Sequence, residues 1–512
     1  MTPVILEIDQ GTTSTRAILF DAAGRKLASH ALPLRQIFPA NGWVEHDGEE
    51  IWQATLAVVR AVLGNRNPGT VAAIGLTNQR ETTLIWDRAT GSPLHNAIVW
   101  QDRRTAVRCD ALRAKGWDRK ITAKTGLLLD PYFSATKLEW LLARVKGAKR
   151  KALAGEILFG TIDSWLIWKL TGGRVHATDV SNASRTMLLN LKTLDWDPAL
   201  LKLFGIPRAI LPQVRDCVGD FGATEPGLFG AAIPILGVSG DQQAASVGQA
   251  CFAPGDVKST YGTGCFVLVN TGSAIAKSRN RLLATALFRK GAHKTYAIEG
   301  SIFMAGAVVQ WLRDAAGLVD SADAIEALAV KAAPAEGLYF VPAFTGLGAP
   351  TWRPDVRAAI TGLTRDMGKA EIARAALDSV CYQTRDLLEA IARDLKGAAA
   401  SARAGATVKK PLKALRRLKV DGGMVKNDWF CQRLADLTGL AVERPVVTET
   451  TALGAAYLAG LGAGLFKNEK DIAARWALDR RFTPILKKTA RDKLYEGWTR
   501  AVRRLTAPDT EI

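Results

Sequence analysis

Residues 5–21, ILEIDQGTTSTRAILFD, constrain the fold of this chain more than any other stretch. Two short apolar runs, 4–8 and 17–20, flank a polar turn, and Gly11 marks a tight bend, so the pattern predicts a β-hairpin. A hairpin tip needs one glycine, but it does not need three successive hydroxyl residues. Those hydroxyls suit a polyphosphate, Asp9 suits Mg²⁺, and Arg16 adds a positive charge. A plain hairpin with a polar tip explains the same residues equally well.

The turn is not a Walker-type phosphate loop, because the pattern G-x-x-x-x-G-K-[ST] occurs nowhere in the chain. It resembles the first phosphate hairpin of the actin/Hsp70/sugar-kinase superfamily, in which nucleotide phosphates lie between two hairpin tips. A second tip is therefore expected, and residues 259–271, STYGTGCFVLVNT, supply one. The two stretches form a distant internal repeat, which is far more specific than a single glycine-rich turn.

The length of 512 residues favours two domains of about 250 residues each, and we place the boundary at 252/253. The first ten residues run straight into a strand, so no signal peptide is expected. No apolar stretch reaches the ~18 residues that a membrane helix needs. The six cysteines are scattered and form no C-x-x-C pair, which favours a reducing cytoplasm and argues against structural zinc.

The net charge of +19 raises the possibility of a nucleic-acid binder. Residues 396–419, however, carry eight basic residues and no acid, which leaves +11 for the rest of the chain. No nucleic-acid-binding motif accompanies this charge, so an enzyme is the preferred interpretation. We expect residues 396–419 to be a solvated basic excursion, and a contact with anionic lipid or another protein is the alternative.

Hydrophobic periodicity predicts the main elements. The expected helices cover residues 48–63, 244–251, 301–316, 369–395 and 450–461, with one more in the basic tail after Pro484. A short helical turn is expected around 412–417. The expected strands, besides the two hairpins, cover residues 71–77, 84–87, 233–238 and 418–420.

Asp241 is the first candidate for a general base. It follows a buried strand and Gly240, and an alcohol that attacks a γ-phosphate needs an acceptor for its proton. Gln242 beside it can orient a hydroxyl. A simple helix cap is a serious alternative for an aspartate at the end of a strand.

Other candidates each have a structural explanation as well. Arg80 and Glu81 offer a donor fork beside an acceptor, which suits a polyol, although a surface ion pair is the commoner fate of such a dipeptide. Tyr132 can add a hydroxyl, and Trp100 and Phe266 can flank a small carbon skeleton, but aromatic side chains more often fill cores.

Two further segments suit a nucleotide. Gly306 and Gln310 are four residues apart on one expected helix and so share a face. Gly423 and Asn427 suit an adenosine at a helix N-terminus. Tight helix packing would explain the first pair, and a strand-to-helix turn with an asparagine cap would explain the second.

Taken together, these segments resemble the FGGY family of carbohydrate kinases, in matching order over nearly the whole chain. The resemblance rests on ILEIDQGTTSTRA, GWVEHD, LTNQRETTLIWD, VWQDRRT, VSGDQQAA, STYGTGCF, GSIFMAGAVVQWLRD and VDGGMVKND. Residues 132–140 and 358–378 also look like the two general signatures of the family. NQRETT and WQDRRT are the segments most specific to its glycerol-phosphorylating branch.

This resemblance implies an α/β fold of two ribonuclease-H-like (actin-like ATPase) domains with a cleft between them. It implies ATP and Mg²⁺ as cofactors, glycerol as substrate, sn-glycerol 3-phosphate as product and Asp241 as base. The implied glycerol contacts are Arg80, Glu81, Trp100, Tyr132, Asp241, Gln242 and Phe266. The implied nucleotide contacts are Thr12, Thr13, Ser14, Arg16, Thr263, Gly306, Gln310, Gly423 and Asn427. The implied metal residues are Asp9 and Asp241.

The resemblance also implies a homo-oligomer, a dimer or tetramer, without an integral membrane segment or nucleic-acid partner. Residues 227–233 lack the Gly-rich, Arg-ending loop that binds fructose 1,6-bisphosphate in some bacterial members, so we expect no strong inhibition by this sugar phosphate. Two alternatives stay open: a kinase of the same family for another polyol or sugar, such as erythritol or xylulose, and a non-catalytic nucleotide switch of the actin type.

Overall fold

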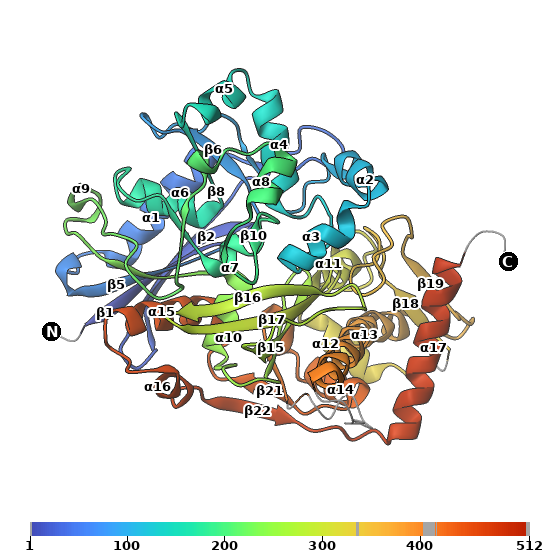
Figure 1. Cartoon of the computed structure of the whole chain (residues 1–512). Coiled ribbons are helices and arrows are strands. Elements are labelled where there is room, and N and C mark those ends of the chain that lie inside the picture. The colour runs from blue at the N-terminus through green and yellow to red at the C-terminus, as the bar shows by residue number, and fades with distance from the viewer. Residues whose placement is uncertain (1–2, 334–336, 403–414, 416, 508–512) are drawn as a thin grey trace.

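The computed structural model describes residues 3–333, 337–402, 415 and 417–507, and each half of the chain is built on one large β-sheet (Figure 1). The first sheet has the strand order β13-β5-β1-β2-β3. Strands β1, β2 and β3 are antiparallel neighbours, whereas β5 lies parallel to β1, and β13 parallel to β5. Their bounds are Val4–Gln10 (β1), Ser14–Asp21 (β2), Lys26–Pro33 (β3), Val71–Asn78 (β5) and Ile235–Gly240 (β13).

The second sheet repeats this topology. Its order is β16-β17-β15-β14-β20-β21-β22, in which β17, β15 and β14 are antiparallel neighbours and β20 and β21 continue in parallel. Strands β16 and β22 extend its two edges. The bounds are Val257–Tyr261 (β14), Cys265–Gly272 (β15), Leu283–Lys290 (β16), His293–Ile302 (β17), Leu418–Asp421 (β20), Val442–Pro445 (β21) and Leu478–Phe482 (β22). The hairpin repeat in the sequence is therefore part of a repeat of whole sheets, as expected for paired ribonuclease-H-like halves.

Helices cover both sheets. In the first half they are α1 (Gly48–Leu63), α2 (Ala106–Ala114), α3 (Trp117–Thr125), α4 (Ser134–Arg144), α5 (Ala148–Leu153), α6 (Ile162–Leu170), α7 (Val180–Ala183), α8 (Pro198–Phe204), α9 (Pro226–Phe229) and α10 (Asp241–Gly248). In the second half they are α11 (Gly306–Asp314), α12 (Ala324–Lys331), α13 (Lys369–Ala402), α14 (Asp428–Thr438), α15 (Thr450–Gly462), α16 (Glu469–Ala473) and α17 (Lys488–Thr506). Short strands pair as β4 (Glu45–His46) with β7 (Ala97–Ile98), β6 (Leu84–Asp87) with β8 (Ile157–Gly160), β9 (Ala177–Asp179) with β12 (Gln213–Arg215), β10 (Leu189–Asn190) with β11 (Asp195–Trp196), and β18 (Tyr339–Val341) with β19 (Ala359–Thr361).

Helix α15 belongs to the second half of the sequence but packs on the first sheet, against β13, β5 and β1 (Figure 1). Glycines make the contact close. A Cβ atom on Gly75 would lie 2.3 Å from the carbonyl oxygen of Ala455, and one on Gly237 would lie 2.3 Å from the backbone nitrogen of Ala459. The boundary at 252/253 stays a prediction, and α15, which follows it in the sequence, packs on the sheet that precedes it.

Most predicted elements are confirmed, the helix over Gly48–Leu63 without any shift. The helix predicted over 301–316 is wrong at its start, because β17 continues to Ile302 and α11 begins only at Gly306. A glycine-rich apolar run fits both structures, and pairing with β15 decides for the strand. Strand β22 in the basic tail was not predicted. The turn predicted around 412–417 falls largely outside the described residues.

The structure describes the end of the basic segment 396–419, where two side chains bind other parts of the chain. Arg417 pairs with Glu443 at 3.1 Å. The ammonium of Lys419 donates to the carbonyl oxygen of Gln249 at 2.6 Å and lies over the ring of Trp476. In the described part of the chain, none of the helices combines the length and apolarity that crossing a bilayer demands.

Two buried histidines of the first half should make the free energy of unfolding depend on pH. Burial lowers the pKa of His176 to about 4, and likewise that of His46. An unfolded histidine has a pKa of about 6.5. Between the folded and unfolded pKa values the unfolded chain binds more protons than the folded protein, so the free energy of unfolding falls as the pH drops from about 6.5 towards 4. Each histidine should contribute about 2 kcal/mol of this loss by pH 5.

Urea unfolding at pH 7, 6 and 5 measures that slope. His176→Gln should flatten it, because an amide can replace the 2.8 Å contact from His176 Nε2 to the carbonyl oxygen of Phe159 without titrating. The exposed His30, replaced in the same way, is the control and should leave the slope unchanged. An equal slope in both variants would contradict the assignment.

Candidate active site

The first phosphate tip is the turn between β1 and β2. The backbone N–H of Gly11 donates to the carbonyl oxygen of Ser14 at 2.9 Å and closes the turn. Thr13 is exposed, whereas Thr12 and Ser14 are half-buried. The hydroxyls that the sequence singled out therefore sit at the tip of an observed hairpin.

The second tip is also closed by a backbone hydrogen bond, from Gly262 N–H to the carbonyl oxygen of Gly264 at 2.9 Å. Thr263 is exposed at its end. Helix α11 begins directly against this tip, because Gly306 N–H donates to the Gly262 carbonyl at 2.8 Å. A Cβ atom on Gly306 would lie 2.7 Å from that oxygen, so only glycine fits.

Two segments next to the second tip remain candidates for nucleotide contacts. A Cβ atom on Gly423 would meet nothing within 4 Å, which leaves open space beside the backbone. Asn427 is the N-cap of α14, and its Oδ1 accepts from Phe430 N–H at 2.7 Å. Gln310 is exposed on α11. The structural explanation of Asn427 is thus confirmed, and its nucleotide contact stays a prediction.

Asp9 and Arg16 form an ion pair at the base of the first tip. The distance from Arg16 Nη2 to Asp9 Oδ2 is 2.8 Å, and Arg16 Nη1 also reaches Glu449 Oε1 at 3.3 Å. Burial raises the pKa of Asp9, Arg16 opposes this, and the nearby Asp241 carboxylate raises it further. No described group of three acidic, His or Cys side chains could hold a metal alone. Two neighbouring carboxylates fit Mg²⁺ that arrives with nucleotide phosphates, because Mg²⁺ on phosphates takes only one or two protein carboxylates.

Asp241 is the first residue of α10, one position after β13 ends, so the strand places it and the helix begins at it. Its Oδ1 lies 3.1 Å from Arg80 Nε and 2.7 Å from the backbone nitrogen of Gln242. The Gln242 amide donates to Oδ2 at 3.1 Å. The Asp241 side chain is 31% exposed, so the carboxylate, held by two hydrogen bonds and by the ion pair with Arg80, is still open to a ligand.

Two aromatic side chains lie next to Trp100. Its ring centroid lies 5.6 Å from that of Tyr132 and 6.3 Å from that of Phe266. The indole Nε1 donates to Thr12 Oγ1 at 2.9 Å. Because Thr12 belongs to the first tip and Phe266 to the hairpin of the second, Trp100 connects the two phosphate hairpins.

Arg80 and Glu81 are buried, so the surface ion pair considered for them is wrong. The terminal nitrogens of Arg80 are not free for a ligand, because Nη1 and Nη2 donate to Glu299 at 2.6 and 3.1 Å. Arg185 Nε donates to Oε1 of Glu81 at 2.6 Å, which leaves the other oxygen of that carboxylate for a ligand. Glu81 has a φ of 62°, a conformation that costs a non-glycine residue about 1 kcal/mol or more and is common at functional sites.

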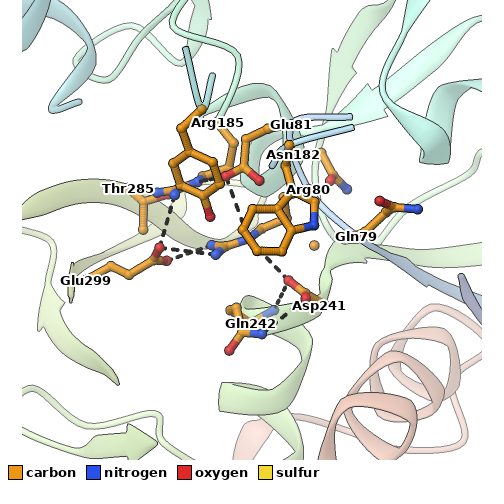
Figure 2. Close-up of polar contacts among 12 residues, drawn as sticks. Gln79, Arg80, Glu81, Asn182, Arg185, Asp241, Gln242, Thr285 and Glu299 are labelled. Carbon is orange, nitrogen blue, oxygen red and sulfur yellow. Dashed lines mark hydrogen bonds and ion pairs between the residues drawn. The ribbon is translucent and has the colours of Figure 1, made fainter. Parts of the chain in front are cut away.

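Sequence reasoning missed several polar residues that join these side chains, and Figure 2 labels two of them, Arg185 and Glu299. The missed residues are Arg185, Gln243, Lys258 and Glu299. Glu299 had a signal: it is the single charge in the otherwise apolar run YAIEG on β17. Lys258 is also fully buried, and its ammonium donates to Gln242 Oε1. Burial lowers the pKa of Lys258, while Asp421 and Asp241 raise it.

Paired sheets of one topology, each with a phosphate-type hairpin, define a two-domain fold of the actin/Hsp70/sugar-kinase superfamily. Residues 4–248 match the N-terminal domain of the FGGY family of carbohydrate kinases, and residues 257–463 match its C-terminal domain. The chain belongs to this family.

Relatives with assigned names are consistent with membership of this family. The chain is 56% identical over 507 residues to glycerol kinase 1 of Pseudomonas aeruginosa, covering 99% of both chains. It is 57% identical over 504 residues to the glycerol kinase of Methylobacterium nodulans, covering 98% of both. The crystal structure of Plasmodium falciparum glycerol kinase with ADP superposes with a TM-score of 0.90 at 36% identity, over 99% of each chain. A xylulose kinase from Lactobacillus acidophilus, 23% identical with a TM-score of 0.84 over 99% of both chains, shares the fold.

Proposed function

We propose that this chain transfers the terminal phosphoryl group of ATP to glycerol and forms sn-glycerol 3-phosphate. The main support is the position of Trp100, which donates a hydrogen bond to Thr12 of the first tip and packs against the rings of Phe266 and Tyr132. An aromatic wall of this kind suits a three-carbon skeleton and places it next to the phosphate turn. Relatives at 55–57% identity that are named glycerol kinases support the same substrate.

In this proposal Asp241 accepts the proton of the attacking hydroxyl. Arg80 Nε and the Gln242 amide hold its carboxylate in position before substrate arrives. Glu81 and Tyr132 bind the remaining hydroxyls, and Trp100 and Phe266 pack against the carbons. Because Glu299 takes the terminal nitrogens of Arg80, we assign Arg80 mainly to orienting Asp241 rather than to gripping the polyol with a free fork.

The nucleotide lies between the two tips in this proposal. Thr12, Thr13, Ser14 and Thr263 donate to phosphate oxygens, and Arg16 adds a positive charge; Gly306, Gln310, Gly423 and Asn427 contact the nucleoside. Mg²⁺, when bound, neutralises phosphate charge, and Asp9 and Asp241 are the carboxylates that would hold it. Closure of the halves on both substrates would exclude water as a competing acceptor.

The proposal also covers the cellular compartment and the oligomeric state of the enzyme. ATP as donor and six free cysteines, all buried, fit a reducing cytoplasm. A homo-oligomer, dimer or tetramer, is the expected assembly, and sedimentation of the purified protein measures it.

Purified protein should release ADP only when glycerol, ATP and Mg²⁺ are all present. A panel of glycerol, erythritol and xylulose at equal concentration should give a kcat/KM for glycerol that exceeds the others by about tenfold or more, because a site built around three carbons leaves a longer chain poorly placed. A higher value for another polyol would move the proposal to that substrate. ADP release that is independent of every polyol would contradict a polyol kinase.

A further inference from the structure

Five side chains of alternating charge form a row in the candidate active site (Figure 2). The row runs Asp241, Arg80, Glu299, Arg185, Glu81. Successive contacts measure 3.1 Å from Arg80 Nε to Asp241, 2.6 Å from Arg80 Nη1 to Glu299, 3.0 Å from Arg185 Nη2 to Glu299 and 2.6 Å from Arg185 Nε to Glu81. Its two ends are the carboxylates that the proposed function assigns to the polyol, and Arg80 Nε also lies 4.0 Å from Glu81 Oε1.

Glu299 is the centre of this row and carries its charge without contact with water. Its side chain is 0% exposed. Burial opposes ionisation, but Arg185 and Arg80 outweigh it and lower the pKa of Glu299 to about 2. One carboxylate thus compensates two buried guanidinium groups, and those groups keep their other nitrogens directed at Asp241 and Glu81.

Glu299 is the only member of the row that comes from the second half of the sequence. It lies in the middle of the second sheet, paired with Leu268 on β15 and Leu283 on β16, so its backbone is fixed from both sides. Hydrogen bonds also join the second sheet to the first half next to Glu299: the hydroxyl of Thr285 on β16 contacts Ser184 at 2.8 Å and Gln243 at 3.2 Å. The second sheet therefore supports both ends of a site whose other charged groups come from the first half.

We propose that Glu299 is a positioning residue for the acceptor site: from the second sheet it fixes Arg80 and Arg185, and through them the two carboxylates, Asp241 and Glu81, that receive the polyol. This inference rests on the proposed function. Glu299 acts through its arginines and does not touch the substrate. Its loss should therefore weaken polyol binding specifically, while the nucleotide tips, which make no described contact with it, keep their affinity.

Glu299→Gln tests this, because the amide keeps the size of the side chain and removes the charge that both arginines need. We expect KM for glycerol to rise about tenfold or more, as for other residues that orient a ligand's partners, with KM for ATP within twofold of the parent. The increase in melting temperature caused by glycerol should disappear, and the increase caused by ADP should remain. Glu299→Asp keeps the charge and should recover part of the glycerol affinity.

Asp378→Asn is the matched control. Asp378 also makes a two-point contact with a buried arginine, Arg433, at 2.7 and 2.9 Å, but both belong to the second half and neither is in the row. It should lower the melting temperature and leave both KM values unchanged. If Glu299→Gln does not fold, Arg185→Lys replaces it, because one ammonium cannot reproduce the fork between Glu299 and Glu81.

The outcomes separate the two proposals. A parent enzyme without glycerol-dependent ADP release overturns the proposed function and this inference with it. An active parent whose variant, Glu299→Gln or Arg185→Lys, keeps KM for glycerol within twofold overturns the inference alone. Equal increases in both KM values, or loss of the ADP effect on melting, would show a general structural role and would also overturn it.

Discussion

Asp241→Asn should lower kcat by about 10²- to 10⁴-fold, the range by which a positioned base accelerates proton transfer. An amide cannot accept the hydroxyl proton at the moment the phosphoryl group arrives. KM for glycerol should change much less, because the amide oxygen can still accept from the Gln242 backbone N–H although the ion pair with Arg80 is lost. Steady-state rates with saturating ATP and variable glycerol measure both constants.

The variant should fold normally, since the Asp241 side chain is partly exposed and is not the only partner of Arg80. Unfolding by urea checks this. The control is Asp118→Asn, an equivalent change in the first turn of α3, which should leave kcat at the parent value. Turnover by Asp241→Asn at the parent rate would exclude Asp241 as the base.

The residues that sequence reasoning located are those whose roles depend on local backbone shape. The turns at Gly11 and Gly262 could be predicted because a hairpin, its glycine and its hydroxyls are neighbours in the chain, and the repeat of the motif predicted the repeat of the sheet. Asp241 could be predicted because a strand end fixes the position of the next residue. Local sequence carries this information directly.

The residues that were missed act over long separations in the chain. Glu299 and Arg80 are 219 positions apart, and Arg185 and Glu81 are 104 apart, so no local pattern reports that they meet. The helix predicted over 301–316 was wrong at its start for the same reason, because pairing of β17 with β15 outweighs the helical propensity of a small apolar run. The apolar run around Glu299 marks it as a buried charge, but its partners come only from the fold.

The contact between α15 and α10 leads to the largest expected effect on stability. Gly454 of α15 faces α10 so closely that a Cβ atom would lie 1.8 Å from the carbonyl oxygen of Ala244, and one on Gly248 would lie 2.0 Å from that of Thr450. The obstacles are backbone atoms, which cannot rotate away. Helix α10 begins at Asp241, so this contact also sets the position of the proposed base.

Gly454→Ala should therefore destabilise the protein by about 3 kcal/mol, because the two helices must move apart to admit one methyl group. Its sign is opposite to that of intrinsic propensity, which favours alanine over glycine inside a helix by about 1 kcal/mol. Gly227→Ala in α9 is the matched control: a Cβ atom there meets nothing within 4 Å, so that variant should be neutral or slightly more stable. Urea unfolding compares the two. An equal change in stability in both variants would show that close packing of α15 on α10 does not fix Asp241. If only Gly454→Ala loses stability, its kcat should fall as well, because α10 carries the base.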